Sequence, residues 1–175
     1  RHLPTLLEAL PRIREKTGEI QCMLPVAESL DLKEIKNITE VSPVPVTLVQ
    51  EQFIEAIRAC DAAIVASGTA SLQTALALTP FVIVYRVSPL TFWIARHLAD
   101  TKYIGLVNVL AEREIVPEIL QNDFTVSNIT KAAVRLLQDE DYRATMICQL
   151  KTTRSKLGEP GAYDKAALCI ENTLR

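Results

Sequence analysis

One stretch of the chain, residues 61–86, restricts the fold more than any other. It reads DAAIVASGTASLQTALALTPFVIVYR, and its apolar run at residues 62–66 is long enough for one buried strand. Small, turn-forming residues follow at 67–69, and apolar residues with helical spacing cover 72–78. A second apolar run at 81–85 supplies another buried strand. This order predicts a βαβ unit in a parallel sheet that helices cover on both faces.

The turn at residues 67–69 carries the chemistry of this unit. Gly68 lets the backbone approach a ligand closely, and the helix after it presents unpaired N–H groups and the positive end of its dipole. Ser67, Thr69 and Ser71 add hydroxyl groups. This combination is typical of a phosphate or diphosphate site. The alternative is that Ser67 or Thr69 only caps the helix.

The residues before this unit alternate between helix and strand patterns. We expect helices at 3–17, 29–38 and 50–59, a strand within 19–27, and a strand at 46–49. Such alternation predicts an α/β fold with an open, doubly wound parallel sheet. Ligands of these sheets bind beyond the C-terminal ends of the strands. Ser67 and Arg86 both follow such ends, so we expect them to face one crevice.

Residues 89–99, PLTFWIARHLA, predict a helix with a proline near its start. Its apolar side chains, Trp93 among them, have two interpretations. They either pack on the sheet, or they form a patch that faces acyl chains or a membrane, helped by Arg96 and Lys102.

Residues 103–174 predict one strand and four helices. The strand is expected at 103–107, which would put Asn108 at the start of a loop beyond a strand end. A short helix is expected at 113–121, where acidic residues in the first turn suit the helix dipole. Longer helices are expected at 127–138, 140–157 and 160–174.

Composition limits the class of protein. The chain has 175 residues, 49% of them hydrophobic, which fits one domain with a sizeable core. Its net charge of −2 gives no electrostatic case for nucleic acid as a partner. The four cysteines form no CxxC pair and only two histidines accompany them. We therefore expect buried, reduced thiols in a cytosolic protein and no metal site. No apolar run is long enough to span a bilayer.

Residues 66–121 closely resemble lipid-A-disaccharide synthase. The motifs that carry the resemblance occur in the order of that family: Ser67-Gly68-Thr69-Ala70, Tyr85-Arg86, Leu90-Thr91-Phe92-Trp93, Asn108, Pro117-Glu118 and Leu120-Gln121. The match is therefore much more specific than a lone glycine motif. It implies a Rossmann-like fold, the C-terminal, UDP-binding half of a GT-B type glycosyltransferase.

The resemblance also implies which residues bind the UDP-sugar. They are Ser67, Gly68, Thr69, Ala70, Gln73, Arg86, Asn108, Glu114, Glu118 and Gln121. No metal and no cofactor is implied. The catalytic base is expected on an N-terminal acceptor domain that precedes this chain. Because the chain starts without Met and directly at a helix, we expect it to be a fragment comprising a single C-terminal domain.

Two residues depart from the pattern of the family. Gln73 stands where the family usually has Glu, and Val107 stands where it has Pro. In related two-domain glycosyltransferases that Glu grips the ribose hydroxyls of UDP. Gln73 can still donate and accept hydrogen bonds, but without charge assistance, so weaker ribose binding is expected. The alternative is that Gln73 is an exposed polar residue in the first turns of the helix.

The implied reaction joins UDP-2,3-diacylglucosamine to 2,3-diacylglucosamine 1-phosphate. It inverts the sugar carbon, releases UDP and forms the β-1,6-linked disaccharide of lipid A. The implied partners are the UDP-diacylglucosamine donor, the lipid acceptor, a membrane surface and a second copy in a homodimer. The implied location is cytoplasmic, peripheral to the inner membrane. We expect the fragment alone to be inactive.

Two other classes of function compete with this one. Another UDP-sugar enzyme of the same two-domain architecture, such as a UDP-N-acetylglucosamine epimerase, fits the βαβ site equally well, but the LTFW and PE-LLQ segments argue against it. A non-catalytic module such as a receiver domain needs clustered acidic residues at strand ends, and the sequence has no such cluster. Binding of radiolabelled UDP would separate the module from the two enzymes.

Overall fold

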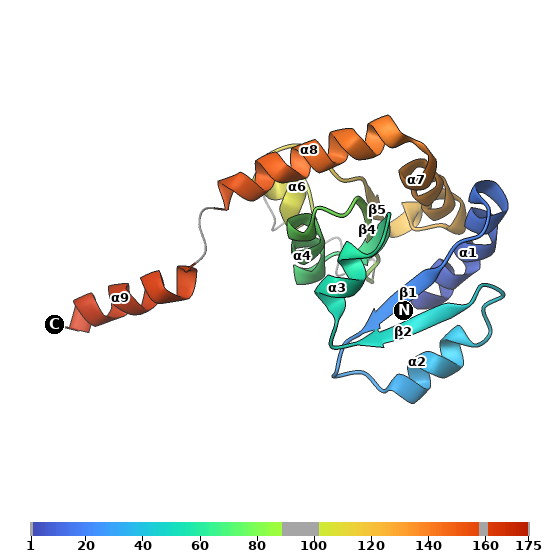
Figure 1. Cartoon of the computed structure of the whole chain (residues 1–175), viewed down its shortest axis with the longest axis horizontal. Helices are drawn as coiled ribbons and strands as arrows, with labels where there is room; N and C mark the ends of the chain where they lie inside the picture. The colour runs from blue at the N-terminus through green and yellow to red at the C-terminus, as the bar shows by residue number, and fades with distance from the viewer. Residues whose placement is uncertain (1, 89–101, 158–160, 175) are drawn as a thin grey trace.

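A computed structural model of the chain describes residues 2–88, 102–157 and 161–174. Helices and strands alternate along most of it (Figure 1). The elements are α1 (Leu3–Thr17), β1 (Cys22–Val26), α2 (Leu32–Thr39), β2 (Val46–Gln50), α3 (Phe53–Arg58), β3 (Ala63–Ala66), α4 (Thr69–Ala77), β4 (Phe81–Tyr85), α6 (Leu106–Ala111), β5 (Glu118–Leu120), the 3-10 helix η1 (Gln121–Asp123), α7 (Val126–Gln138), α8 (Glu140–Lys156) and α9 (Ala162–Leu174).

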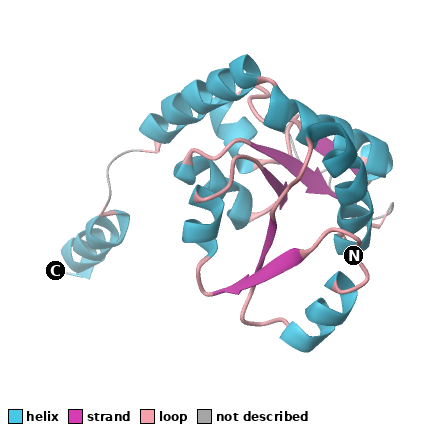
Figure 2. Cartoon of the chain, turned by 45° about the vertical axis from the view of Figure 1, so that its right-hand side comes forward, coloured by secondary structure: helices cyan, strands magenta, loops and turns pink. Residues whose placement is uncertain are grey.

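The strands form two parallel ladders. β1 pairs with β2, while β4 lies between β3 and β5. In the three-stranded ladder Ala66 lies opposite Val84, and Tyr85 lies opposite Leu120. Helices lie on both sides of the strands (Figure 2). The predicted α/β fold with parallel strands between helices is therefore confirmed.

The core is built around β4. Phe81, Val82, Ile83 and Val84 are all 0% exposed, because α4 and α7 both pack against this central strand. Burying each such side chain stabilises the fold by about 1.5–3 kcal/mol relative to leaving it in water. The continuous apolar run at 81–85 is thus explained by its place in the middle of the sheet.

The predicted strand at 103–107 is wrong, because residues 106–111 form helix α6. A short apolar run does not distinguish strand from helix by periodicity alone. Here Glu118 favours the helix, because its carboxylate accepts the backbone N–H groups of Ile104 and Gly105, both at 2.9 Å, just before the helix begins. Gly105 also packs so closely on Ile83 that a Cβ atom at this position would collide with it.

The predicted helix at 113–121 is also wrong, because the segment ends in strand β5. The N–H groups of Ile115 and Val116 donate to the Asn108 side chain at 2.9 and 3.0 Å instead of to helical carbonyls. Pro117 has no N–H to donate. The chain is therefore drawn out beside β4 and pairs with it.

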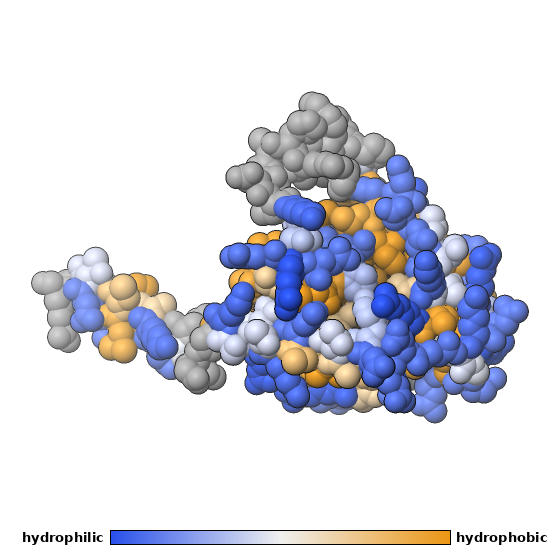
Figure 3. All heavy atoms as spheres, turned by 90° about the horizontal axis from the view of Figure 1, so that it is seen from above, coloured by the Kyte–Doolittle hydropathy of each residue, from blue (hydrophilic) through white to orange (hydrophobic). Residues whose placement is uncertain are grey.

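The three predicted C-terminal helices are confirmed as α7, α8 and α9. Thr125 caps α7 by accepting the Asn128 N–H at 3.2 Å, and Asp139 caps α8 by accepting the Tyr142 N–H at 2.9 Å. Helix α9 extends away from the rest of the chain (Figures 1 and 3). The predicted helix at 89–99 lies outside the described residues.

All four cysteines are free. Cys22 and Cys60 are partly buried, and burial raises the pKa of both thiols. Cys148 and Cys169 are exposed, so the expectation of buried thiols is wrong for these two. Cys148 lies on α8 and Cys169 on α9.

Candidate functional site

The C-terminal ends of β3, β4 and β5 bring several predicted site residues to one edge of the sheet. Ser67 directly follows β3, Arg86 follows β4 and Gln121 follows β5. Since the three strands are parallel and in register at their ends, these residues leave the sheet on the same side. We call the group formed by Ser67–Thr69, Arg86 and Gln121 the open edge.

The turn at the open edge depends on glycine. Gly68 has φ 151° and ψ −162°, a backbone conformation that other residues adopt only with strain. It is the N-cap of α4 and forms no side-chain capping bond. Ser67 instead donates its hydroxyl to the carbonyl of Ile104 at 3.4 Å. The alternative that Ser67 or Thr69 caps the helix is therefore wrong, and Gly68 and Thr69, at the start of α4, are exposed.

The segment after β4 is held by side chains from two other elements. The N–H of Arg86 donates to Nε2 of His2 at 2.9 Å. The next N–H, that of Val87, donates to Oε1 of Gln121 at 3.4 Å. Arg86 itself is exposed, so the guanidinium belongs to the surface of this edge.

Gln121 combines two unfavourable features. Its φ of 47° lies in the left-handed region, which is uncommon for a residue other than glycine. Its Nε2 atom is buried and has no hydrogen-bond partner among the described residues. Because the N–H of Val87 can only donate, the oxygen of Gln121 must face it, and the amide cannot be turned over to relieve Nε2. Strain and an unpaired donor at one residue are typical of a functional position.

Asn108 and Glu118 lie next to this edge, and their side chains form hydrogen bonds with other groups of the protein. Asn108 is 0% exposed; it donates to the Val116 carbonyl at 2.7 Å and to Glu118 at 2.8 Å. Its oxygen accepts two backbone N–H groups, so all its hydrogen-bonding groups are used. We call Asn108, Glu118 and the backbone that they bind, at 104–105 and 115–116, the Asn108 network. It adjoins the open edge where Ser67 meets Ile104.

The structure does not bring Glu114 to the open edge. Glu114 is exposed and helps to line a cavity of about 280 Å³ against α8, together with Tyr142, Thr145 and Gln149. Gln73 is exposed on α4, while Ala70 is half-buried at the start of that helix. The alternative that Gln73 is an exposed polar residue thus agrees with its position.

A family model described as lipid-A-disaccharide synthetase matches residues 1–172. The chain belongs to the lipid-A-disaccharide synthase family. The resemblance carried by the motifs between residues 67 and 121 is therefore confirmed.

Several members of this family are similar along nearly the whole chain. The lipid-A-disaccharide synthase of Syntrophotalea carbinolica is 36% identical over 98% of this chain and 44% of its own length. That of Myxococcus xanthus is 38% identical over 95% of this chain and 44% of its own length. That of Anaeromyxobacter dehalogenans (strain 2CP-C) is 40% identical over 100% of this chain and 46% of its own length. The chain thus spans less than half the length of these relatives.

Sequence reasoning from the synthase motifs missed one residue of the site, His2. Its ring stacks on Tyr85 with centroids 6.2 Å apart and meets Phe124 edge-on at 5.3 Å. Its bond to Arg86 spans 84 residues of sequence. No periodicity or spacing signals a contact of this kind, because only the folded sheet brings the three segments together.

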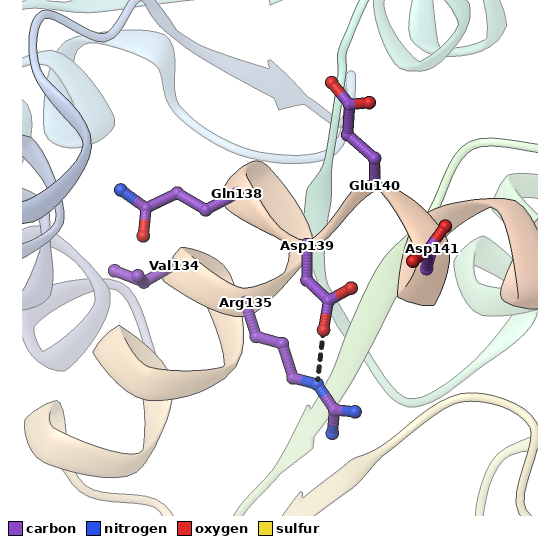
Figure 4. A pocket seen from close by; sticks show the side chains of 6 residues that line it. All are labelled: Val134, Arg135, Gln138, Asp139, Glu140 and Asp141. Carbon is purple, nitrogen blue, oxygen red and sulfur yellow. Dashed lines mark hydrogen bonds and ion pairs between the residues drawn. The ribbon is translucent and has the colours of Figure 1, made fainter.

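Another cavity, of about 640 Å³, lies at the corner between α7 and α8 (Figure 4). Among the residues that line it, Arg135 contacts Asp139 at 3.5 Å and lies 3.7 Å from the centre of the Tyr142 ring. Burial raises the pKa of Tyr142, and the charge of Arg135 opposes that shift. The other residues that line this cavity are Val134, Gln138 and the acidic Asp139, Glu140 and Asp141, and none of them belongs to the synthase motifs.

Within residues 2–88, 102–157 and 161–174, no group of three His, Cys, Asp or Glu residues is arranged to hold a metal ion. Across the same ranges, every helix is too short or too polar to cross a membrane.

Proposed function

We propose that this chain is the donor-binding half of a lipid-A-disaccharide synthase, and that the open edge binds the diphosphate of UDP-2,3-diacylglucosamine. The observation that carries the proposal is the Gly68 turn. It joins a strand end to the N-terminus of α4 in a conformation suited to glycine, beside the exposed Arg86. Helix N-termini bind anions through their N–H groups and dipole, and Arg adds a permanent positive charge.

Each residue of the open edge has a proposed role. The backbone of Ser67–Thr69, continued by Ala70, holds the phosphate oxygens, and Arg86 neutralises them. The unpaired Nε2 of Gln121 donates to an acceptor atom of the nucleotide, which would relieve its buried, unsatisfied state. Gln73, exposed on α4, binds the ribose hydroxyls.

Asn108 and Glu118 have an indirect role in this proposal. Their polar atoms are bound within the Asn108 network, and giving up those bonds for a ligand would leave buried backbone groups unpaired. We propose that they hold the loop at Ile104 against Ser67 and so shape the turn. Glu114 is left out of the proposed contacts, because its neighbours are residues of α8.

The proposed reaction is transfer of the diacylglucosamine group to the 6-hydroxyl of 2,3-diacylglucosamine 1-phosphate, with inversion and release of UDP. Negative charge develops on the leaving diphosphate, and fixed N–H donors and a guanidinium stabilise it. The acceptor hydroxyl needs a base. We propose that the base, the acceptor site, contact with the cytoplasmic face of the inner membrane and any homodimer contact involve the parent protein as a whole, of which this chain is one domain.

Calorimetry on the chain tests the diphosphate site. We expect UDP to bind about tenfold more tightly than UMP, because the second phosphate adds charge-assisted hydrogen bonds to the turn and to Arg86. Equal affinities for UDP and UMP, or no binding of either, would contradict the proposal.

A transfer assay tests whether the chain alone can catalyse the reaction. The chain alone, given UDP-2,3-diacylglucosamine and the acceptor lipid, should form no disaccharide, whereas the parent protein should form it. Turnover by the chain at the rate of the parent would show that the base lies within these residues. An epimerised sugar nucleotide as the product of the parent would favour the epimerase instead.

A further inference from the structure

His2 joins three segments that are far apart in the sequence. It is the N-cap residue of α1, it accepts the backbone N–H of Arg86 at the end of β4, and its ring meets Phe124, which lies between η1 and α7. The ring also stacks on Tyr85, the last residue of β4, with an angle of 20° between the two rings. The imidazole thus contacts two aromatic rings, one stacked and one edge-on.

The hydrogen bond at His2 has a defined direction. A backbone N–H can only donate, so Nε2 of His2 must accept, and the neutral ring then carries its proton on Nδ1. The packing of Tyr85 and Phe124 fixes the plane of the ring. His2 therefore presents a lone pair at one position, where the N–H of Arg86 meets it at 2.9 Å.

The hydrogen bond between His2 and Arg86 lies just beyond the last paired residue of β4. Tyr85 is the last residue of β4 paired with β5, so the N–H groups of Arg86 and Val87 lie beyond the strand. Each is bound by a side chain, the first by His2 and the second by Gln121. Two consecutive amides fixed in this way determine the direction in which the Arg86 side chain leaves the backbone.

We propose that His2 is a positioning residue: it holds the backbone of Arg86 so that the guanidinium reaches the diphosphate bound at the Gly68 turn. The inference rests on the proposed function for the identity of the ligand, whereas the contacts of His2 do not depend on that function. In this proposal His2 does not touch the donor, and it acts through Arg86 alone.

Two substitutions separate the acceptor from the ring. His2→Phe keeps a ring that can pack between Tyr85 and Phe124 but removes the acceptor for the Arg86 N–H. His2→Gln removes the ring and supplies a side-chain oxygen that can accept the same N–H. Thermal melting of both variants checks that the fold is retained, and calorimetry measures the affinity of each for UDP.

We expect His2→Phe to weaken UDP binding by about three- to tenfold, the worth of one ordinary hydrogen bond, and His2→Gln to recover part of the loss. Hydrogen exchange of the Arg86 amide, followed by NMR, should become faster in His2→Phe and stay slow in the unchanged chain. In an Arg86→Ala background, His2→Phe should have no further effect on UDP affinity, because the two residues then act as one unit.

Three results would overturn the proposal. They are unchanged UDP affinity in His2→Phe, unchanged exchange of the Arg86 amide, or an equal loss of affinity with and without the Arg86 side chain. Failure of the unchanged chain to bind UDP would contradict the proposed function itself, and with it the proposed effect of His2 on UDP binding. UDP binding that His2→Phe leaves intact would contradict the His2 proposal alone.

Discussion

The open edge and the Asn108 network adjoin each other, yet they use their polar groups in opposite ways. At the open edge, Gly68 and Arg86 are exposed and Gln121 carries a buried donor without a partner among the described residues. In the Asn108 network, the amide of Asn108 makes four hydrogen bonds and the Glu118 carboxylate accepts three.

This difference separates recognition from support. An exposed or unpaired group gains hydrogen bonds when a ligand arrives, whereas a buried and satisfied group must first lose the bonds it has. Family motifs contain both kinds of residue without distinguishing them. We therefore expect substitutions in the Asn108 network to reduce stability and those at the open edge to reduce ligand affinity.

The largest effect is expected for Asn108→Ala. The substitution removes the side-chain partner of two backbone N–H groups and one carbonyl, and one of the three hydrogen bonds of the Glu118 carboxylate. We expect the free energy of unfolding in urea to fall by about 3–5 kcal/mol. Asn128→Ala is the matched control, since Asn128 is exposed and its side chain donates to the Asp123 carbonyl; it should cost less than about 1 kcal/mol. If Asn108→Ala kept its stability but lost UDP affinity, Asn108 would be a ligand contact instead.

Gly68→Val should act chiefly on binding. A branched side chain disfavours φ 151° and would move the turn away from the phosphates, so we expect UDP affinity to fall by about 30-fold or more. Gly18→Val is the control, because Gly18 also has a positive φ, 88°, but ends α1 away from the open edge. It should lose similar stability and bind UDP normally. Equal affinities in both variants would remove the diphosphate from this turn.

Gln121→Glu tests the unpaired donor. The new side chain keeps an oxygen for the Val87 N–H but replaces Nε2 with a second carboxylate oxygen, which repels phosphate. We expect about a tenfold loss of UDP affinity, smaller at high salt. Gln138→Glu adds the same charge on α7, where Gln138 donates to the Lys16 carbonyl, and should leave UDP affinity unchanged. Similar losses in the two variants would indicate a general effect of charge.

The smallest effect is expected at Gln73. Because Gln73 is exposed, a hydrogen bond to the ribose should be worth only about 0.5–1.5 kcal/mol, which Gln73→Ala would lose. Gln73→Glu should keep or tighten UDP binding through charge assistance. Calorimetry on the three proteins decides; identical affinities would mean that Gln73 is a surface residue without a ligand.

The βαβ unit was predictable because its signals are local. The apolar runs at 62–66 and 81–85 and the glycine turn between them appear in the structure as expected. Segment 103–121 was mispredicted because distant bonds decide it: Glu118 starts α6, and Asn108 captures the N–H groups of residues 115 and 116. His2 could not be predicted, because its partners lie in segments that only the fold brings together.

Chemical-shift mapping by NMR tests whether the open edge, and not the Asn108 network, binds the nucleotide. UDP is added to the isotopically labelled chain, and the backbone amide signals of both regions are followed. We expect the amide signals of Gly68, Thr69, Arg86 and Gln121 to move most, and those of Ile115 and Val116 in the Asn108 network to move little. The largest shifts at Ile115, Val116 or Glu114, with the Gly68 turn unaffected, would contradict this expectation.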